Sequence, residues 1–210
     1  MSLIKSDNIK LFTFNYEDDV VNVPRNFRVL KTLRRHSKDI GNDRDLPYIK
    51  EIFDNCSLFE CDVFGYINSD ILLDKSFFNL FKESIDAYVF YRKEIIDTKS
   101  HDFINGDFEY VWGGDKHVGN DAIFFNKDWW IGNRHKFPDS LILGETEWDT
   151  CYRRIIKGES NNFLMERSLW HVFHHTNWKL DSKGALNNIS VLKNIEDKYG
   201  EEANKNFTDH

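Results

Sequence analysis

The amino-acid sequence predicts a single α/β domain in which a central sheet is flanked by helices. Short apolar runs rich in β-branched and aromatic residues alternate along the chain with segments that carry a helical apolar face. No internal repeat and no linker divides the sequence, and its 210 residues fit one domain with a substantial core. We therefore expect residues 1–210 to form one domain, with a polar tail from about residue 200.

The expected strands are short apolar runs, most of which end at polar residues. Ile9–Phe14 is the first of them, and a second apolar run ends at Asn68. The same pattern predicts further strands at Ala87–Tyr91 and Ala122–Phe125, and strands or edge pieces at Phe163–Met165 and Leu169–Phe173.

Helices are expected where apolar residues recur every three or four positions after a capping residue. Asn22 is a candidate cap, and Pro24 stands just inside a helix whose apolar face would hold Val23, Phe27, Leu30 and Leu33. The other expected helices are Pro47–Phe53, a segment capped by Asp74, Trp148–Ile156 and Asn187–Tyr199.

Composition and charge argue against some classes of partner. The net charge of −7, with acidic and basic residues interspersed, argues against nucleic acid as the main partner. No apolar run is long enough to span a membrane, and the N-terminus lacks the layout of a signal peptide, so we expect a soluble, cytoplasmic protein. The cysteines form no Cys-x-x-Cys pair and are expected to be buried thiols: Cys56, Cys61 and Cys151.

The most informative segment is the apolar run that ends in Asn68-Ser69-Asp70 before apolar residues resume. A buried strand has this pattern when its carboxyl end carries polar side chains into a crevice, which is where open α/β sheets bind nucleotides. A carboxylate there can hold a divalent cation against a diphosphate, because hard cations prefer oxygen ligands. The alternative is a strand followed by an ordinary Asx-type turn.

Two further polar clusters precede expected elements. Trp112–Asp121 is rich in Gly, Asn and Asp; its Asp121 could accept hydrogen bonds from sugar hydroxyls, and the alternative is a solvated Gly-rich turn. Glu145, Glu147 and Asp149 surround Trp148, whose indole could offer an apolar face to a sugar ring. Acidic residues also favour the first turn of a helix for dipole reasons alone, so both interpretations stay open.

The last cluster runs from Trp170 to Lys179 and contains His171, His174 and His175. Histidine is a common ligand of divalent metals, and His171 could join Asp70 on one ion. A strand would place His171 and His175 on one face, whereas a helix would group all three histidines, so the spacing does not identify the ligand. A buried histidine satisfied by the core is the alternative.

Several catalytic motifs are absent from the sequence. It contains no Gly-x-x-x-x-Gly-Lys-Ser/Thr loop, no Gly-x-Gly-x-x-Gly after the first expected strand, and no Gly-x-Ser-x-Gly elbow. His-Glu-x-x-His is also missing. P-loop phosphoryl transfer, dinucleotide redox chemistry, serine hydrolysis and zinc-peptidase chemistry therefore lack their usual markers.

Taken in chain order, the four clusters resemble a nucleotide-sugar glycosyltransferase of the GT-A type. Tyr66-Ile67-Asn68-Ser69-Asp70-Ile71 resembles the Asp-x-Asp strand end of that fold, with Asp70 matching the metal-binding second aspartate and Asn68 replacing the first. Gly119–Phe125 resembles the acceptor-side strand, and Gly144–Asp149 resembles the acidic segment before the catalytic helix. The resemblance spans about residues 9–180 and implies a Rossmann-like GT-A fold with a mixed central sheet.

The resemblance extends to the metal. His171 falls near the C-terminal metal histidine of many retaining members, which implies that Asp70 and His171 bind Mn²⁺ or Mg²⁺. The Lys-Pro-Trp ending of some retaining relatives is missing, and Asn177-Trp178-Lys179 is only a loose counterpart. The small size and Phe-, Asn- and Lys-rich composition are also similar to the compact glycosyltransferase domain encoded by a large chlorella virus, which would place a viral protein in the host cytoplasm.

The activity that the resemblance implies is transfer of a hexose from a UDP-sugar to a glycan or glycoprotein hydroxyl, with the metal neutralising charge on the departing UDP. Carboxylates near the sugar carbon would stabilise an oxocarbenium-like state or accept a proton; Asp149 is the first choice, followed by Glu145 and Asp121. Retention is expected, because a metal site with a histidine accompanies no obvious single base. The implied donor-binding residues are Thr13 for uracil, Arg44 or Lys179 for phosphate, and Asn68, Ser69 and Asp70 at the strand end.

Two other functions compete with this one. A nucleotide-sugar hydrolase or a nucleotidyltransferase on a related α/β sheet would use the same polar clusters. A carbohydrate-binding module would need no catalysis, and its stacking platforms would be Trp112, Trp129, Trp130 and Trp148.

Overall fold

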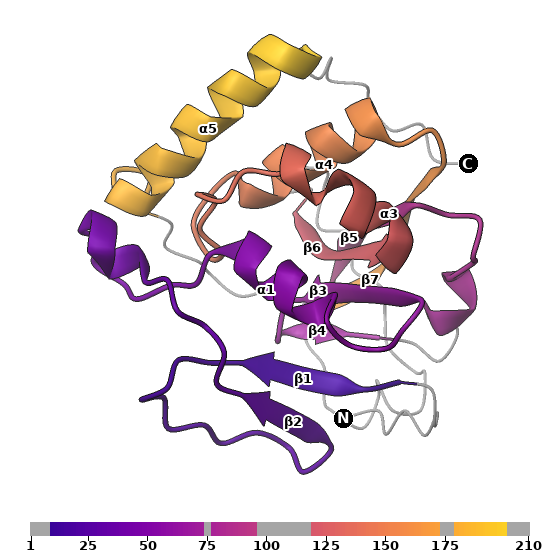
Figure 1. Ribbon diagram of the computed structural model, residues 1–210, viewed down its shortest axis with the longest axis horizontal. Coiled ribbons are helices and arrows are strands. Elements are labelled where there is room, and N and C mark those ends of the chain that lie inside the picture. Colours follow the sequence, from indigo (N-terminus) through magenta and orange to yellow (C-terminus); the bar gives the residue numbers. More distant parts are fainter. Residues whose placement is uncertain (1–8, 74–76, 96–118, 173–178, 201–210) are drawn as a thin grey trace.

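The computed structural model describes residues 9–73, 77–95, 119–172 and 179–200. Within these ranges the chain is mixed α/β with a mixed central sheet, which confirms the predicted α/β class. A five-stranded mixed sheet stands at the centre, four α-helices accompany it, and a separate two-stranded sheet lies below it in the view of Figure 1. In these ranges no helix is both long and apolar enough to cross a membrane.

The central sheet has the strand order β3-β6-β5-β7-β4. Its strands are β3 Val63–Ile67, β4 Ile71–Leu72, β5 Ala87–Ile95, β6 Asn120–Asn126 and β7 Phe163–Val172. β5 and β7 are parallel, and the other neighbouring pairs are antiparallel. The apolar pieces expected at Phe163–Met165 and Leu169–Phe173 thus belong to one strand through Val172.

The first two strands form their own parallel pair, β1 Leu11–Phe14 with β2 Phe27–Leu30. The prediction of a helix after Pro24 is therefore wrong. The Pro24 carbonyl accepts a hydrogen bond from the Phe27 amide at 2.9 Å, so the proline opens a turn that leads into the strand. β2 is only four residues long, Phe27–Leu30, and its pattern suits a pleated strand as well as a helix at this length.

The four α-helices are α1 Ile49–Cys56, α3 Lys127–Asn133, α4 Trp148–Glu159 and α5 Lys183–Tyr199. α1, α4 and α5 lie where the periodicity predicts helices, with ends shifted by a few residues. α3 was not expected; the Asn126 side chain begins it by accepting hydrogen bonds from the Asp128 and Trp129 amides. The segment expected to be a helix after Asp74 is a short 3₁₀ turn at Phe77–Leu80, and Asp74 itself lies outside the described residues.

Aromatic rings stand at the centre of the core on each of the two faces of the central sheet. On one face Phe53 of α1, Trp130 of α3 and Tyr152 of α4 surround Phe125 of β6. The other face carries a second, smaller cluster centred on the rings of Phe77, Tyr88, Phe90 and Phe124. Each fully buried aromatic side chain contributes about 1.5–3 kcal/mol of transfer free energy, so these rings anchor the sheet that carries the site.

Gly65 in β3 is required by this packing. It pairs with Phe124 of β6, whose ring lies where a Cβ atom on residue 65 would stand. The absence of a side chain therefore lets the ring lie flat against β3, which is a recurrent use of glycine within a strand. This contact joins β3 to β6, the two strands that carry the first two polar clusters.

Candidate functional site

The ends of five strands meet at one edge of the central sheet, and the candidate site forms there. Because β3 and β6 are antiparallel, the end of β3 lies beside the start of β6, and the Asn68 amide donates to the Asp121 carbonyl at 2.9 Å. β5 and β7 finish at the same edge, and β4 runs back along β7 so that Ile71 lies opposite His171. The topology therefore brings together clusters that are up to about a hundred residues apart in the chain.

We call the residues gathered there the strand-end cluster: Asn68, Asp70, Arg92, Asp121, Asp149 and His171. All but Arg92 were candidate site residues from sequence. Asp70, Arg92, Asp149 and His171 all lie close enough to Asp121 to influence its pKa, which shows that they share one region.

Two irregularities in strand pairing shape this edge. Between β5 and β6, Phe90 pairs with Ala122 and Tyr91 with Asn120, which leaves Asp121 as an extra residue in β6. Between β5 and β7 the register shifts again, between Tyr91 and Arg92. Bulges of this kind redirect side chains and are common beside active sites. Here they accompany a contact in which Arg92 reaches the Asp121 carboxylate at 3.1 Å.

Asp70 and His171 form the pair expected to bind metal. Asp70 Oδ2 and His171 Nε2 lie 3.2 Å apart. The His171 side chain is 3 % exposed and that of Asp70 is 42 % exposed, so a buried imidazole faces a carboxylate open to solvent. The Asn68 carbonyl also accepts from the Ile71 amide at 3.3 Å, so the segment is a turn as well as a candidate site.

The donor set fits an ion that is partly held by a substrate. Two neighbouring ligands of an octahedral ion stand about 3 Å apart when the metal–ligand bonds are about 2.1 Å, close to the spacing of this pair. In the described ranges no group of three or more His, Cys, Asp or Glu side chains is arranged around one ion. Cations carried by phosphates need only one or two protein ligands, and a carboxylate with an imidazole suits Mn²⁺.

Asp121 is the most deeply buried carboxylate of the cluster, with 4 % of the residue exposed. Its Oδ1 accepts hydrogen bonds from Asn68 Nδ2 at 2.7 Å and Arg92 at 3.1 Å. Its Oδ2 is buried and has no hydrogen-bond partner in the described part of the chain. Burial raises the pKa of Asp121 above its ordinary value, and the neighbouring Asp149 and Asp70 add to this effect, while Arg92 and His171 oppose it.

Asp149 lies in the first turn of α4 and ties this helix to the start of β6. Its Oδ2 accepts from the Asn120 amide at 3.0 Å and from Asn120 Nδ2 at 3.1 Å. Asn120 Oδ1, like Asp121 Oδ2, is buried without a hydrogen-bond partner among the described residues. The cluster thus holds two buried acceptor atoms that a ligand's hydroxyl groups could satisfy.

The tryptophans that were expected to stack on a sugar ring are mostly engaged in the core. Trp148 is buried and packs edge-on against the Tyr66 ring, with 5.6 Å between ring centroids. Trp130 is fully buried in the core, and Trp129 stacks on Phe125. The suggestions that Trp148 offers a face to a sugar and that Trp130 and Trp148 are stacking platforms are therefore wrong.

The third catalytic candidate, Glu145, belongs to a different set of contacts. Its Oε1 accepts from Asn42 Nδ2 and pairs with Arg44, both at 3.2 Å, and its Oε2 accepts from Ser182 Oγ at 2.9 Å. Ser182 in turn caps α5 by accepting from the Ala185 amide. We call Asn42, Arg44, Glu145 and Ser182 the α5 brace.

The α5 brace lines a cavity of about 130 Å³ that also contains Asp43 and Lys179. Both candidate phosphate ligands, Arg44 and Lys179, therefore lie in one place. Arg44 also donates to the Gly144 carbonyl at 2.7 Å, so its guanidinium is partly engaged within the protein. The arrangement positions α5 against the segment before α4.

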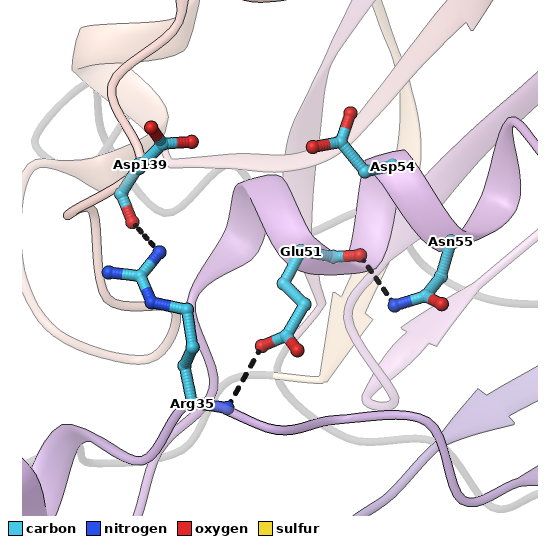
Figure 2. A pocket seen from close by; sticks show the side chains of 5 residues that line it. All are labelled: Arg35, Glu51, Asp54, Asn55 and Asp139. Carbon is cyan, nitrogen blue, oxygen red and sulfur yellow. Dashed lines mark hydrogen bonds between the residues drawn. The ribbon is translucent and has the colours of Figure 1, made fainter.

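A second concavity, of about 230 Å³, was not expected from sequence (Figure 2). The Glu51 carboxylate accepts from the Arg34 and Arg35 amides, and the Arg35 guanidinium donates to the Asp139 carbonyl at 2.6 Å. Asn55 donates to the Glu51 carbonyl within α1. These bonds tie the chain before α1 to the helix and indicate a structural role.

The remaining candidates lie elsewhere. Thr13 lies in β1, and its hydroxyl oxygen is buried without a hydrogen-bond partner in the described ranges. Ser69 is exposed in the turn after β3. The candidates at Trp112, His174 and His175 lie outside the described residues.

Sequence reasoning missed Arg92 and the roles of Tyr66 and Asn120. One signal could have found Arg92, because it is the first charged residue after the apolar run Ala87–Tyr91, just as Asn68 follows β3. The bulges that accompany its contact with Asp121 have no sequence signature of their own.

Comparisons with known proteins add no relationship. No protein-family model matches the chain, and a search of curated proteins finds no significant match.

Proposed function

We propose that the protein is a GT-A-type glycosyltransferase that moves a hexose from a UDP-sugar to a glycan hydroxyl, assisted by Mn²⁺ or Mg²⁺. The observation that carries the proposal is the convergence of Asp70, Asp121, Asp149 and His171, from four separate segments, at one edge of the sheet. A single-domain α/β protein places ligands at such strand ends. The resemblance of the same segments to the motifs of this enzyme class supports the assignment.

In this proposal Asp70 and His171 hold the cation. The ion, when bound, would neutralise charge on the diphosphate as UDP leaves. Burial keeps the His171 imidazole in place, while the exposure of Asp70 leaves its carboxylate accessible to a substrate-carried ion. Ser69 is adjacent to Asp70 in the exposed turn after β3, and we assign it a contact with the donor.

Asp121 and Asp149 act on the sugar. Asp121 Oδ2 is a buried acceptor that a donor-sugar hydroxyl would satisfy. In this proposal the same carboxylate stabilises positive charge that develops on the sugar ring. Asp149 is our candidate for accepting the proton of the incoming hydroxyl. We expect retention of configuration, because His171 corresponds to the C-terminal metal histidine of retaining members in the resemblance described above.

The residues outside the cluster receive secondary roles. Thr13 remains the candidate for contact with uracil. Of the two phosphate candidates we retain Lys179, because the Arg44 guanidinium is engaged with Glu145 and the Gly144 carbonyl. Glu145 is given no part in the transfer, because both of its oxygens are bound within the α5 brace.

The test is calorimetric titration of the protein with UDP, with and without Mn²⁺, on the wild type, Asp70→Ala and the control Asp139→Ala. Asp139 is an exposed aspartate with a surface ion pair to Lys50, so its loss removes a carboxylate away from the site. We expect the wild type and the control to bind UDP only with Mn²⁺, and to gain about 5 °C in Tm at saturating ligand. Asp70→Ala should fold and bind no UDP. Equal affinity in Asp70→Ala would remove this residue from the site.

Transfer is distinguished from hydrolysis by the products. The carboxylates of the strand-end cluster could also activate water, in which case UDP and free sugar would form at the same rate with or without a glycan acceptor. A binding module would retain a glycan regardless of UDP and of chelator; the burial of Trp130 and Trp148 argues against it.

A further inference from the structure

The side chain of Asn68 lies between two other side chains. Its Oδ1 accepts a hydrogen bond from the Tyr66 hydroxyl at 2.7 Å, and its Nδ2 donates to Asp121 Oδ1, also at 2.7 Å. A carboxylate only accepts hydrogen bonds, so the amide nitrogen must face Asp121 and the amide oxygen must face Tyr66. The orientation of the amide is therefore fixed by its neighbours.

This orientation leaves Asn68 poorly placed as a ligand. A metal ion or a ribose hydroxyl would have to use Oδ1, which already accepts a short bond from Tyr66. The Tyr66 ring packs edge-on against the buried Trp148, so the hydroxyl is held in place. Burial raises the pKa of Tyr66, with Asp70 and Asp121 adding to the effect, so its hydroxyl stays protonated and remains a donor.

The other end of the amide acts on Asp121. Asn68 and Arg92 both donate to Oδ1, which fixes the plane of the carboxylate and leaves Oδ2 as the oxygen without a partner among the described residues. If Asn68 were removed, Arg92 alone would hold the carboxylate, and rotation about its bond to the chain would no longer be prevented.

We propose that Asn68 is a positioning residue that presents Asp121 Oδ2 to the substrate, and that it binds neither the metal nor the nucleotide. Its role in turnover rests on the glycosyltransferase function proposed above, whereas its pairing with Asp121 does not. On this view Asn68 does not replace an aspartate as a weaker metal ligand, because it is not a metal ligand at all. A carboxylate at residue 68 would stand about 2.7 Å from another carboxylate, and two such charges repel strongly.

The nucleotide-binding experiment uses Asn68→Ala and Tyr66→Phe, with Asn133→Asp as a control that changes an amide on α3. UDP affinity with Mn²⁺ is measured by calorimetry, and kcat and KM are measured with the UDP-sugar that the wild type uses. We expect UDP affinity to stay within about threefold of the wild type and kcat to fall by about 10–100-fold, because misplacement of a reacting group affects the chemical step. A tenfold or greater loss of UDP affinity with kcat retained would overturn the proposal.

The pairing experiment measures unfolding by denaturant without ligand, for Asn68→Asp, Asp121→Asn and the double variant that exchanges the two residues. We expect Asn68→Asp to lower the denaturation midpoint, and the exchange to restore most of that loss, because one amide again faces one carboxylate. Turnover should stay low in the exchanged protein, since the charge is misplaced. Additive losses of stability, or an Asn68→Asp protein as stable as the wild type with higher turnover, would overturn the proposal.

The two experiments separate the two proposals. If the wild type neither binds UDP nor transfers a sugar, the proposed function fails. The exchange of residues 68 and 121 needs no ligand, so it still tests whether Asn68 is paired with Asp121. If Asn68→Ala does not fold, Tyr66→Phe removes only a hydroxyl and tests the same orientation.

Discussion

The strand-end cluster and the α5 brace are both built around a buried carboxylate, but they satisfy it differently. Glu145 has hydrogen-bond partners on both oxygens, from Asn42 and Arg44 on Oε1 and from Ser182 on Oε2. Asp121 has two partners on Oδ1 and, in the described part of the chain, none on Oδ2. The two carboxylates are almost equally buried, so exposure does not explain the difference.

The difference indicates which region is structural and which is suited to a ligand. An unpaired buried polar atom costs about 1–3 kcal/mol, and a ligand hydroxyl that paired with it would recover that cost. The α5 brace has no such atom on its carboxylate and joins three segments of the chain. The strand-end cluster has one on Asp121, next to a solvent-exposed Asp70, and the adjacent residue Asn120 has another. From residue type alone, Glu145 and Asp121 would be equally good candidates for a catalytic carboxylate.

The largest effect is expected from Asp149→Asn, which tests whether the strand-end cluster is chemical. The amide oxygen of the new side chain can still accept from Asn120, so the tie between α4 and β6 should survive. Loss of the charge removes the proposed proton acceptor, and turnover should fall by about 10²–10⁴-fold. UDP affinity with Mn²⁺, measured by calorimetry, should be close to that of the wild type.

Near-normal turnover in Asp149→Asn would show that this carboxylate only ties α4 to β6. Glu60→Gln is the matched control, because Glu60 is an exposed residue in the chain before β3. It should change neither turnover nor UDP affinity.

A smaller effect, on stability and not on binding, is expected from Glu145→Gln. The variant keeps the shape of the side chain but weakens charge-assisted hydrogen bonds with Arg44 and Ser182 and turns one oxygen into a donor. The free energy of unfolding should fall by about 1–3 kcal/mol in denaturant titrations, with UDP affinity unchanged. If instead the stability were unchanged and UDP affinity were lost, the α5 brace would belong to the binding site.

Much of the strand-end cluster could be predicted from sequence, because polar residues that end apolar strands have few other places to go. Asn68, Asp70, Asp121 and His171 all stand at or beside such ends, and the sheet brings them together without any further device. Asp149 was also predicted, from its place among acidic residues at the start of an expected helix. These signals are local, and the periodicity of the flanking segments locates them within a few residues.

The contacts that decide the roles could not be predicted in this way. Arg92 accompanies bulges whose register depends on three paired strands. Glu145 was ranked with the catalytic carboxylates because its partners come from loops about a hundred residues earlier and a helix cap further on. The segment Phe27–Leu30 was expected to be helical because four residues are too few to separate the two periods, and pairing with β1 decided the outcome.

The smallest effect concerns pH and contrasts a well-paired carboxylate with Asp121. Glu159, at the end of α4, accepts from Lys136 and from the Tyr199 hydroxyl, both at 2.6 Å, and its side chain is 17 % exposed. These bonds lower the pKa of Glu159 from its ordinary 4.5 to about 2, whereas burial raises the pKa of Asp121.

A carboxyl group with a lowered folded-state pKa stabilises the protein above its unfolded pKa, and that contribution is lost as pH falls from about 4.5 towards 2. Glu159→Gln should therefore cost about 0.5–1 kcal/mol at pH 6 and progressively less below pH 4.5, measured as the difference in unfolding free energy across that range. A difference independent of pH would show that Glu159 holds α4 to α5 through packing and neutral hydrogen bonds, and the contrast with Asp121 would then not rest on charge.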